Sequence, residues 1–260
     1  MTFEPVEIVP QSRAEGALVN LVLVCDHATN REPPGIALGL PAAEMARHIA
    51  YDIGARGVTL GLAERLGAGA VLATFSRLVI DPNRGDDDPT LVMKLSDGAI
   101  VPGNRAVDGA EVARRRAAYS APYHRAISGA LDRVIAGGGR PALVSVHSFT
   151  PQFRGRPRRP WHVALLWDRD ERLVRPLFGR LRAAPDLVVG DNEPYTGRLE
   201  GDCMWRHGTR RGVPHVLIEI RNDLIAEPAG EAAWATRLAD PIRAAVAEAT
   251  GLPEGAPAPT

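Results

Sequence analysis

Residues 141–150 read PALVSVHSFT, and the interpretation of the rest of the sequence starts from this stretch. Its first six residues are rich in apolar and β-branched side chains, which predicts a buried β-strand. The strand runs directly into His147 and Ser148. Ligands of open α/β sheets bind beyond the carboxyl ends of the strands. A histidine at this point is therefore a candidate for chemistry as well as for structure.

Strand-like and helix-like segments alternate along the rest of the chain. The predicted strands cover residues 18–25, 70–80, 142–147, 161–167, 186–190 and 215–220. The predicted helices cover residues 42–66, 108–136, 170–184 and 229–250. Near-continuous apolar strands are typical of sheets buried on both faces. The pattern predicts an α/β fold with three αβα layers and a mixed, mostly parallel sheet.

No linker-like stretch divides the sequence, so we expect a single domain over residues 1–260, with its core at about 18–250. Residues 251–260 are rich in proline, glycine and alanine, and we expect them to be frayed. Three regions lack clear periodicity: 81–107, 148–160 and, more weakly, 191–212. Long loops in a compact domain are often functional.

Composition excludes several classes of partner. The 31 basic and 31 acidic side chains give a formal net charge of zero, which favours neither nucleic acid nor an anionic membrane. The two cysteines, Cys25 and Cys203, lie far apart in sequence, which favours a reduced compartment over a disulfide framework. The N-terminal residues lack a signal-peptide pattern, and no apolar run reaches the roughly 18 residues of a membrane span. We expect a cytoplasmic protein.

Polar residues at the strand ends point to metal-assisted hydrolysis. His27 follows one predicted strand, His147 ends another, and Glu219 lies within an apolar run. Imidazoles can hold zinc, and a carboxylate can take a proton from water. Two alternatives remain open: each histidine could be a hydrogen-bonded structural residue, and Glu219 could pair with Arg221, two residues along the same strand face. Arg221 could otherwise serve an anionic substrate.

Zinc normally requires a third protein ligand. Asp52 is our candidate, because helical spacing would align it with Met45 and Ile49 on one apolar face. A hydrogen-bonded pair of His48 and Asp52 is the competing structural interpretation. Further candidates for the third ligand are Asp26, Asn30, Glu32 and, more distant in sequence, His124.

Several motifs together resemble the N-formylglutamate amidohydrolase family. They are VCDHATNREP, YDIGA, FSRLVIDPNR, PYHRAI, SVHSFTP, RPWHVALLWDRD, GDNEPYTG and IEIRNDL, in order across about residues 18–240. The first motif reads VCDHA where the histidine-degradation enzyme usually has PH-x-G, so the substrate stays open. The resemblance implies a hydrolase of an N-formyl or other N-acyl amino acid, such as N-formylglutamate.

The family is similar in turn to zinc carboxypeptidases, and this implies roles for several residues. His147-Ser148-Phe149 matches their strand-end zinc motif, and Glu219 matches their catalytic glutamate. Asn83 and Arg84 match their binders of the substrate carboxylate, although Arg84 could instead pair with the acidic run 86–88. Tyr195 matches, less closely, a tyrosine that caps the substrate. Where carboxypeptidases have His-x-x-Glu, this chain has His27 and Asn30.

The implied mechanism uses one Zn²⁺ per chain, held by His27, His147 and Asp52, with Glu219 as the base. Three candidates could bind a second anionic group: Arg77, His207 and the basic stretch RGRPRRP, 154–160, which could equally be a solvated loop. Two cationic groups would suit a dicarboxylate, and one would suit a general amino acid. The alternatives are a carboxypeptidase, another N-acyl-amino-acid amidohydrolase, and a non-catalytic protein that binds an anion or metal. The sequence leaves the native metal and the oligomeric state open.

Overall fold

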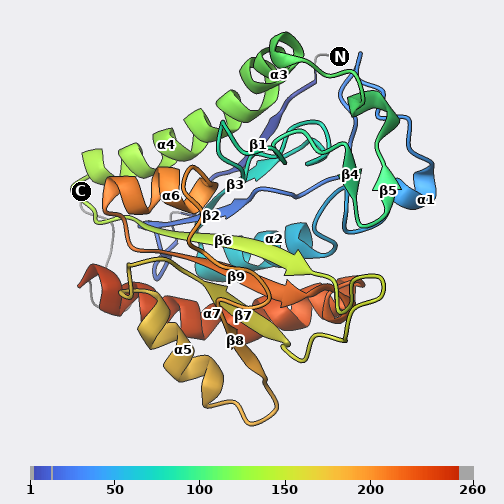
Figure 1. Cartoon of the computed structure of the whole chain (residues 1–260). Coiled ribbons are helices and arrows are strands. Elements are labelled where there is room, and N and C mark those ends of the chain that lie inside the picture. The colour runs from blue at the N-terminus through green and yellow to red at the C-terminus, as the bar shows by residue number, and fades with distance from the viewer. Residues whose placement is uncertain (1–2, 13, 252–260) are drawn as a thin grey trace.

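The computed structural model describes residues 3–12 and 14–251 (Figure 1). Seven strands form one sheet in the order β1-β3-β2-β6-β9-β7-β8. They are β1 (Val6–Val9), β2 (Leu21–Cys25), β3 (Gly69–Ala73), β6 (Ala142–Phe149), β7 (Val163–Leu166), β8 (Val189–Asp191) and β9 (His215–Arg221). Strands β1 and β7 are antiparallel to β3 and β9, and the remaining pairs are parallel. The predicted mixed, mostly parallel sheet is confirmed.

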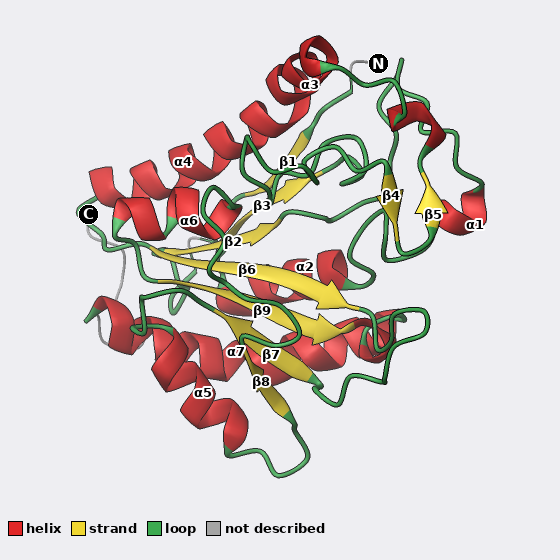
Figure 2. Cartoon of the chain, in the orientation of Figure 1, coloured by secondary structure: helices red, strands yellow, loops and turns green. Residues whose placement is uncertain are grey.

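Helices cover both faces of the sheet (Figure 2). Helices α2 (Ala55–Leu66), α5 (Val174–Arg182) and α7 (Pro228–Thr250) pack on one face. On the other face lie α4 (Ala121–Ala136) and α6 (Cys203–His207), and α3 (Gly109–Arg115) joins α4 through a π-helical turn. The predicted αβα arrangement is therefore present. No helix in the described ranges is long and apolar enough to cross a membrane.

Alternation along the strands decides which side chains reach the α4/α6 face. In β9, Val216, Ile218 and Ile220 pack in the core beneath α7. Because successive side chains of a strand point to opposite faces, Leu217 and Glu219 lie on the opposite face, where Leu217 joins the core beneath α6. In β6 the same alternation turns His147 toward that face. The functional candidates of β6 and β9 thus share one face.

The structure differs from the predicted elements in five places. The helix predicted over 42–66 is two short pieces, α1 (Ala42–Met45) and α2, separated by turns. The strand predicted over 70–80 ends at Ala73, at the end of β3. Strand β1 and helix α6 were not predicted, and the region 81–107 contains a small hairpin, β4 (Leu95–Ser96) with β5 (Ala99–Ile100). The expected fraying over 251–260 falls almost entirely on residues outside the described ranges.

The interruption of the 42–66 helix has a tertiary cause. The backbone carbonyl of Ala50 accepts hydrogen bonds from Ser76 Oγ and the Arg77 backbone N–H, and the Asp52 backbone N–H donates to the His27 carbonyl at 3.0 Å. These contacts replace helical hydrogen bonds and override the local helical pattern. Gly54 completes the break at φ 78°, where a Cβ would lie 2.0 Å from the Ile225 carbonyl oxygen.

Candidate active site

Two neighbouring strands carry the predicted histidines to one place. Strand β2 pairs with β3 on one side and with β6 on the other, so the chain reverses its direction of progress through the sheet between β2 and β6. Such a reversal opens a crevice at the carboxyl ends of the strands. His27 follows β2 by two residues, and His147 lies near the end of β6. Glu219 of β9 is in register with His147.

His27, Asp52 and His147 converge on one point. One nitrogen from each histidine and one Asp52 oxygen all lie within 4.8 Å of one another. His147 Nδ1 is 2.7 Å from Asp52 Oδ2, and His27 Nδ1 is 3.3 Å from the same oxygen. All three side chains are buried. The structure therefore brings together the three residues predicted as metal ligands.

The far nitrogens of both histidines are held by carboxylates. His27 Nε2 donates to Asp81 Oδ1 at 2.7 Å, and His147 Nε2 donates to Asp26 Oδ2 at 2.7 Å. A carboxylate oxygen only accepts, so each ring carries a proton on Nε2. Burial opposes the charge of His147, yet its hydrogen bonds to Asp26 and Asp52 raise the pKa of His147 well above its ordinary value, so a metal at this site would displace a proton from Nδ1 of that ring. This is the arrangement by which proteins orient metal-binding histidines. Both rings thus present Nδ1 toward Asp52.

The two supporting carboxylates are themselves fixed. Asp26 accepts hydrogen bonds from Tyr123 Oη at 3.0 Å and Ser145 Oγ at 2.9 Å. Burial alone would raise the pKa of Asp26, but the hydrogen bond and charge of His147 hold that pKa below its ordinary value. Asp26 was considered as a ligand from sequence, and the structure gives it this supporting position instead.

Asp81 is held in the same way from the other side. Its Oδ2 accepts from Arg77 Nη2 at 2.8 Å, and its Oδ1 accepts from the Asn83 backbone N–H at 2.9 Å. Burial opposes ionisation of Asp81, yet Arg77 and His27 hold the pKa of its carboxyl well below the usual value. Sequence reasoning did not single out Asp81. Its place after a predicted strand, in LVIDPNR, was the available signal.

Asp52 reaches the site by a route other than the predicted one. It lies in the turns between α1 and α2, not on a helical face shared with Met45 and Ile49. The His48–Asp52 pair considered as an alternative is also not formed: the charged partner of His48 is Asp97, at 3.5 Å from its Nε2. Asp52 Oδ2 additionally accepts the Ser148 backbone N–H at 3.2 Å. Two loops and a strand end therefore fix this carboxylate.

The donor set fits a metal ion. Among the described residues, His27 Nδ1 is a buried nitrogen with no hydrogen-bond partner, although buried polar atoms are normally satisfied. Two imidazole nitrogens and one carboxylate oxygen are ligands typical of catalytic zinc, which keeps its remaining position for water or substrate. A cation among Nδ1 of both rings and Oδ2 of Asp52 would satisfy the unpaired atom.

Glu219, in register with His147, is a buried carboxylate with one oxygen that has no hydrogen-bond partner among the described residues. It is 6% exposed, and the unpaired oxygen is Oε2. Burial raises the pKa of Glu219 to about 7; the Asp52 charge adds to this effect, and His147 opposes it. The alternative of an ion pair with Arg221 is not formed, because Arg221 Nε donates to Asp223 at 2.7 Å.

A cavity of about 660 Å³ opens onto this group. Eight of the predicted site residues line it: His27, Asp52, Arg77, Asn83, Arg84, His147, Tyr195 and Glu219. The Arg84 guanidinium donates to Thr90 Oγ1 at 3.1 Å and to its neighbour's carbonyl, and it lies 3.9 Å from Asp88. The alternative pairing of Arg84 with the acidic run is thus present only as a long contact. The cavity volume is in the range of small-molecule sites.

Arg221 and His207 are predicted substrate binders that the structure leaves outside the cavity lining. Arg221 turns to Asp223 and to the Trp161 carbonyl. The basic stretch 154–160 also contributes no lining residue. Its Arg159 stacks over Phe153, at 4.2 Å from the ring centroid, and donates to Tyr195 Oη at 3.2 Å. Asn30 and Glu32, considered as ligands, donate to the Met45 carbonyl and accept from the Leu38 N–H respectively.

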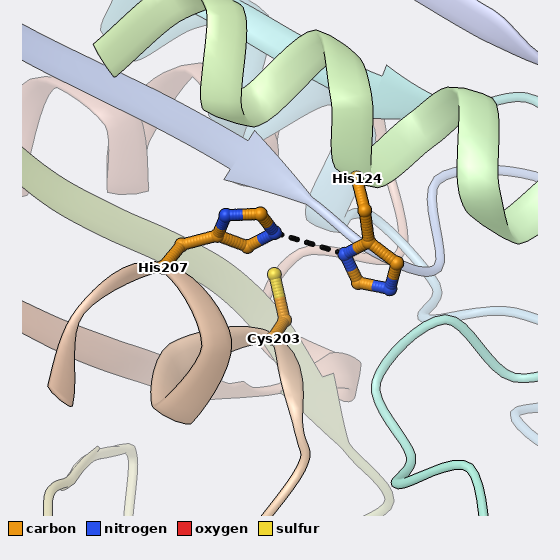
Figure 3. A group of neighbouring side chains, drawn as sticks. All are labelled: His124, Cys203 and His207. Carbon is orange, nitrogen blue, oxygen red and sulfur yellow. Dashed lines mark hydrogen bonds between the residues drawn. The ribbon is translucent and has the colours of Figure 1, made fainter. Parts of the chain in front are cut away.

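His207 belongs to a second cluster, with His124 and Cys203 (Figure 3). His124 projects from α4, and the other two come from α6. His124 Nδ1 and His207 Nε2 are hydrogen-bonded at 2.9 Å, and the Cys203 thiol points toward the two rings. Burial lowers the pKa of His124 to about 4 and that of His207 to about 3, and neighbouring arginines add to both effects. These histidines are therefore neutral and bonded to each other.

Comparison with known proteins decides the family. A sequence profile of the N-formylglutamate amidohydrolase family matches residues 19–226. The chain belongs to this family. The match spans both predicted metal-binding histidines, Asp52 and Glu219, and the resemblance found in the sequence motifs is thereby confirmed. The prediction of an amide-hydrolysing enzyme is confirmed at the level of the family.

Individual family relatives agree with this assignment. The N-formylglutamate deformylase of Pseudomonas aeruginosa is 30% identical over 217 residues, which cover 76% of this chain and 70% of the relative. A gene product of Agrobacterium tumefaciens superposes with a TM-score of 0.86 at 34% identity, over 94% of this chain and 96% of that one. The N-formylglutamate amidohydrolase of Ralstonia eutropha JMP134 shares the fold, with a TM-score of 0.71 at 24% identity over 95% and 99% of the two chains.

Proposed function

We propose that the protein is a zinc-dependent hydrolase of the amide bond in N-formyl or other N-acyl amino acids, with N-formylglutamate as the first substrate to test. The observation that carries this proposal is the convergence of two carboxylate-anchored histidines and Asp52 beside an unpaired Glu219. The name of the Pseudomonas aeruginosa relative supports the N-formyl substrate. The products would be formate, or another small acid, and the free amino acid.

His27, Asp52 and His147 would hold the zinc ion. When bound, zinc acts as a Lewis acid that polarises an amide carbonyl and lowers the pKa of water. Asp26 and Asp81 would keep the two imidazoles oriented and raise their basicity toward the metal. Arg77 donates to both Asp81 and Asp52, so it stabilises the ligand carboxylate and one supporting carboxylate together.

Glu219 would act as general base and then as general acid. Its burial and its free Oε2 suit proton transfer near neutral pH, where a catalytic carboxyl works best if its pKa is raised. Glu219 would take a proton from the water that attacks the amide carbon. It would then pass that proton to the amide nitrogen as the carbon–nitrogen bond breaks and the amine leaves.

Asn83 and Arg84 would bind the substrate carboxylate. Asn83 Oδ1 accepts the Cys203 backbone N–H at 3.1 Å, which leaves the amide NH₂ group as the donor available to a ligand. Arg84 presents a guanidinium, which suits a carboxylate. Tyr195 lies at the cavity lining and is 38% exposed, a position from which it could cover a bound substrate.

Metal content and turnover test the proposal together. Protein purified without chelators or metal-affinity resin should contain about one zinc per chain by inductively coupled plasma mass spectrometry. It should release formate from N-formyl amino acids. Glu219→Gln should retain the zinc and lose roughly 10²- to 10⁴-fold in kcat, the usual contribution of a general acid–base group. A blocked dipeptide is assayed in parallel, because it is a substrate for the competing carboxypeptidase activity.

Two outcomes would refute the proposal. If zinc fails to bind even when it is added, the metal mechanism is wrong. If zinc binds but neither N-acyl amino acids nor the dipeptide are hydrolysed, the site is a metal-binding site without catalysis.

A further inference from the structure

We propose that the preferred substrate carries one carboxylate and an apolar amino-acid side chain, rather than the second carboxylate of glutamate; this inference rests on the proposed function. The cavity has one arginine available to an anion, and an apolar floor lies where the side chain would reach. Both features come from residues whose positions are fixed by the sheet and by α6.

Cationic groups in the cavity are fewer than the sequence suggested. Arg77 and Arg84 are the only arginines or lysines among the described lining residues. Arg77 is already engaged by two buried carboxylates, with Nη2 2.8 Å from Asp81 and Nη1 3.3 Å from Asp52. His207, Arg221 and the basic stretch 154–160 lie outside the lining. Arg84 therefore remains to bind one substrate carboxylate, and among the described lining residues no further arginine or lysine is left to pair with a second.

Negative charge in the cavity adds to this selectivity. The lining includes Asp202, a residue 3% exposed that accepts the Trp205 backbone N–H at 2.7 Å at the start of α6. Asp202 immediately precedes Cys203, whose backbone N–H holds Asn83. A second substrate carboxylate near α6 would be desolvated, unpaired and close to a like charge, and all three conditions are unfavourable.

Three apolar side chains form the floor of the cavity near α6, beside His215 and Asp202, which also line the cavity. Leu217 of β9 and Leu166 of β7 are paired in register, so both lie on the same face of the sheet. Met204 of α6 joins them in one buried cluster, and all three line the cavity. Leu217 precedes Glu219 by two residues, which places this floor about 7 Å along the strand from the proposed base.

The direction of the substrate follows from Asn83 and α6. The carboxylate binder Asn83 is hydrogen-bonded to α6, the helix that also supplies Met204. We place the α-carbon of a substrate bound there next to α6 and its side chain toward Met204, because Asn83 and Met204 both line the cavity beside this helix. The acyl group is on the other side of the scissile bond. The apolar floor therefore contacts the amino-acid side chain rather than the acyl group.

Kinetics with a matched set of N-formyl amino acids test this inference. The zinc-loaded protein is assayed at pH 8, because burial raises the pKa of Asp202 to about 7 and the carboxyl is then ionised. We expect kcat/KM for N-formyl-L-leucine and N-formyl-L-methionine to exceed that for N-formyl-L-glutamate by about tenfold or more. N-formyl-L-glutamine, the neutral isostere of the glutamate compound, should also exceed it.

The outcomes separate this inference from the proposed function. Equal or better hydrolysis of the glutamate compound would overturn the inference and leave the function intact. Failure of the zinc-loaded protein to hydrolyse any of the four compounds would instead remove the N-formyl function itself.

Substitutions of Met204, a residue of the apolar floor, test whether the floor determines which amino-acid side chain is preferred. Met204→Arg supplies a second cation, so the glutamate-to-leucine ratio of kcat/KM should rise at least tenfold, whereas Met204→Leu should leave that ratio within about threefold of wild type. An unchanged ratio in a folded, zinc-loaded Met204→Arg protein would show that the side chain does not contact this floor. If Met204→Arg does not fold, the wild-type series with its glutamate–glutamine pair still decides the inference.

Discussion

Among the described residues there are two clusters of two histidines and a third donor, and the clusters differ in the hydrogen bonds that their histidine nitrogens make. In the His27–Asp52–His147 cluster, each ring donates its Nε2 proton to a separate carboxylate, and both Nδ1 atoms face Asp52. In the other cluster, His124 and His207 are hydrogen-bonded to each other. In each cluster the three candidate donor atoms lie within 4.8 Å of one another. The distances between donor atoms therefore do not distinguish the two clusters.

The supporting groups do distinguish the clusters. Asp26 and Asp81 give the first cluster a negative environment and fixed ring orientations, which favour a cation. The second cluster has no carboxylate hydrogen-bonded to its rings among the described residues, and burial with nearby arginines lowers the pKa of both histidines. We infer that a candidate metal site is recognised by the partners of its ligands, and that the second cluster serves to join α4 to α6.

The largest expected effect comes from removing a histidine of the first cluster, and a matched removal from the second cluster is its control. His147→Ala removes a proposed ligand and leaves Asp26 and Asp52 as neighbouring buried carboxylates, so bound zinc should be lost and turnover should fall to background. His124→Ala removes a matched imidazole from the other cluster. It should retain about one zinc per chain and activity within a few-fold of wild type. Metal analysis and formate release measure both.

This pair of variants can also contradict the comparison. Two zinc ions per wild-type chain, with one lost in His124→Ala, would make the second cluster a metal site. Full zinc content in folded His147→Ala would remove the first cluster as the site. Thermal unfolding of each variant identifies a protein that has simply failed to fold.

A smaller effect is expected from a supporting carboxylate. Asp81→Asn retains an oxygen that can accept the His27 Nε2 proton but loses the negative charge. Such changes typically weaken metal affinity or activity by about 10- to 100-fold. Competition with a zinc chelator measures the affinity. Asp132→Asn, which removes an exposed ion pair with Arg211, is the matched control and should have no effect. Equal affinity in the two variants would show that Asp81 does not support the site.

Sequence patterns predicted where the site histidines lie, because the strands that carry them are recognised from short-range periodicity. Strand periodicity put His147 and Glu219 on predicted strands, and parallel pairing then brought them into register. The role of Asp52 was predicted through a helical spacing that does not exist. Its position depends on Gly54, on the His27 carbonyl and on Ser148, which are contacts between segments far apart in the chain.

The residues outside the cavity show the limit of sequence reasoning. His207 lies on α6, a helix of five residues within a region that had no clear periodicity. Short helices leave little periodic signal, and nothing local indicated that His207 would meet His124, 83 residues away. Arg221 was predicted to approach the substrate because it lies at the end of a predicted strand, but its guanidinium donates to Asp223 instead.

The smallest expected effect is a pH-dependent change in the stability of the metal-free protein. The pKa of Glu219 is about 7 in the folded protein, against 4.5 ordinarily. Well below pH 4.5, Glu219 is protonated in both the folded and the unfolded protein, so its burial does not lower the free energy of unfolding. As the pH rises toward 7, the unfolded chain ionises first, so folding loses stability, by roughly 3 kcal/mol at most above pH 7. Glu219→Gln cannot ionise and escapes this loss.

Thermal unfolding with excess chelator measures this difference. At pH 8 the Glu219→Gln protein should unfold at a higher temperature than wild type, by about 2–4 °C for each kcal/mol, and the gap should shrink at pH 5. Glu248→Gln, at an exposed position, should show no such pH dependence. The same carboxylate that destabilises the metal-free fold would be stabilised by a cation at His27, Asp52 and His147. A gap between Glu219→Gln and wild type that does not change with pH would mean that Glu219 already has a partner, and it could then not serve as the free base beside the metal.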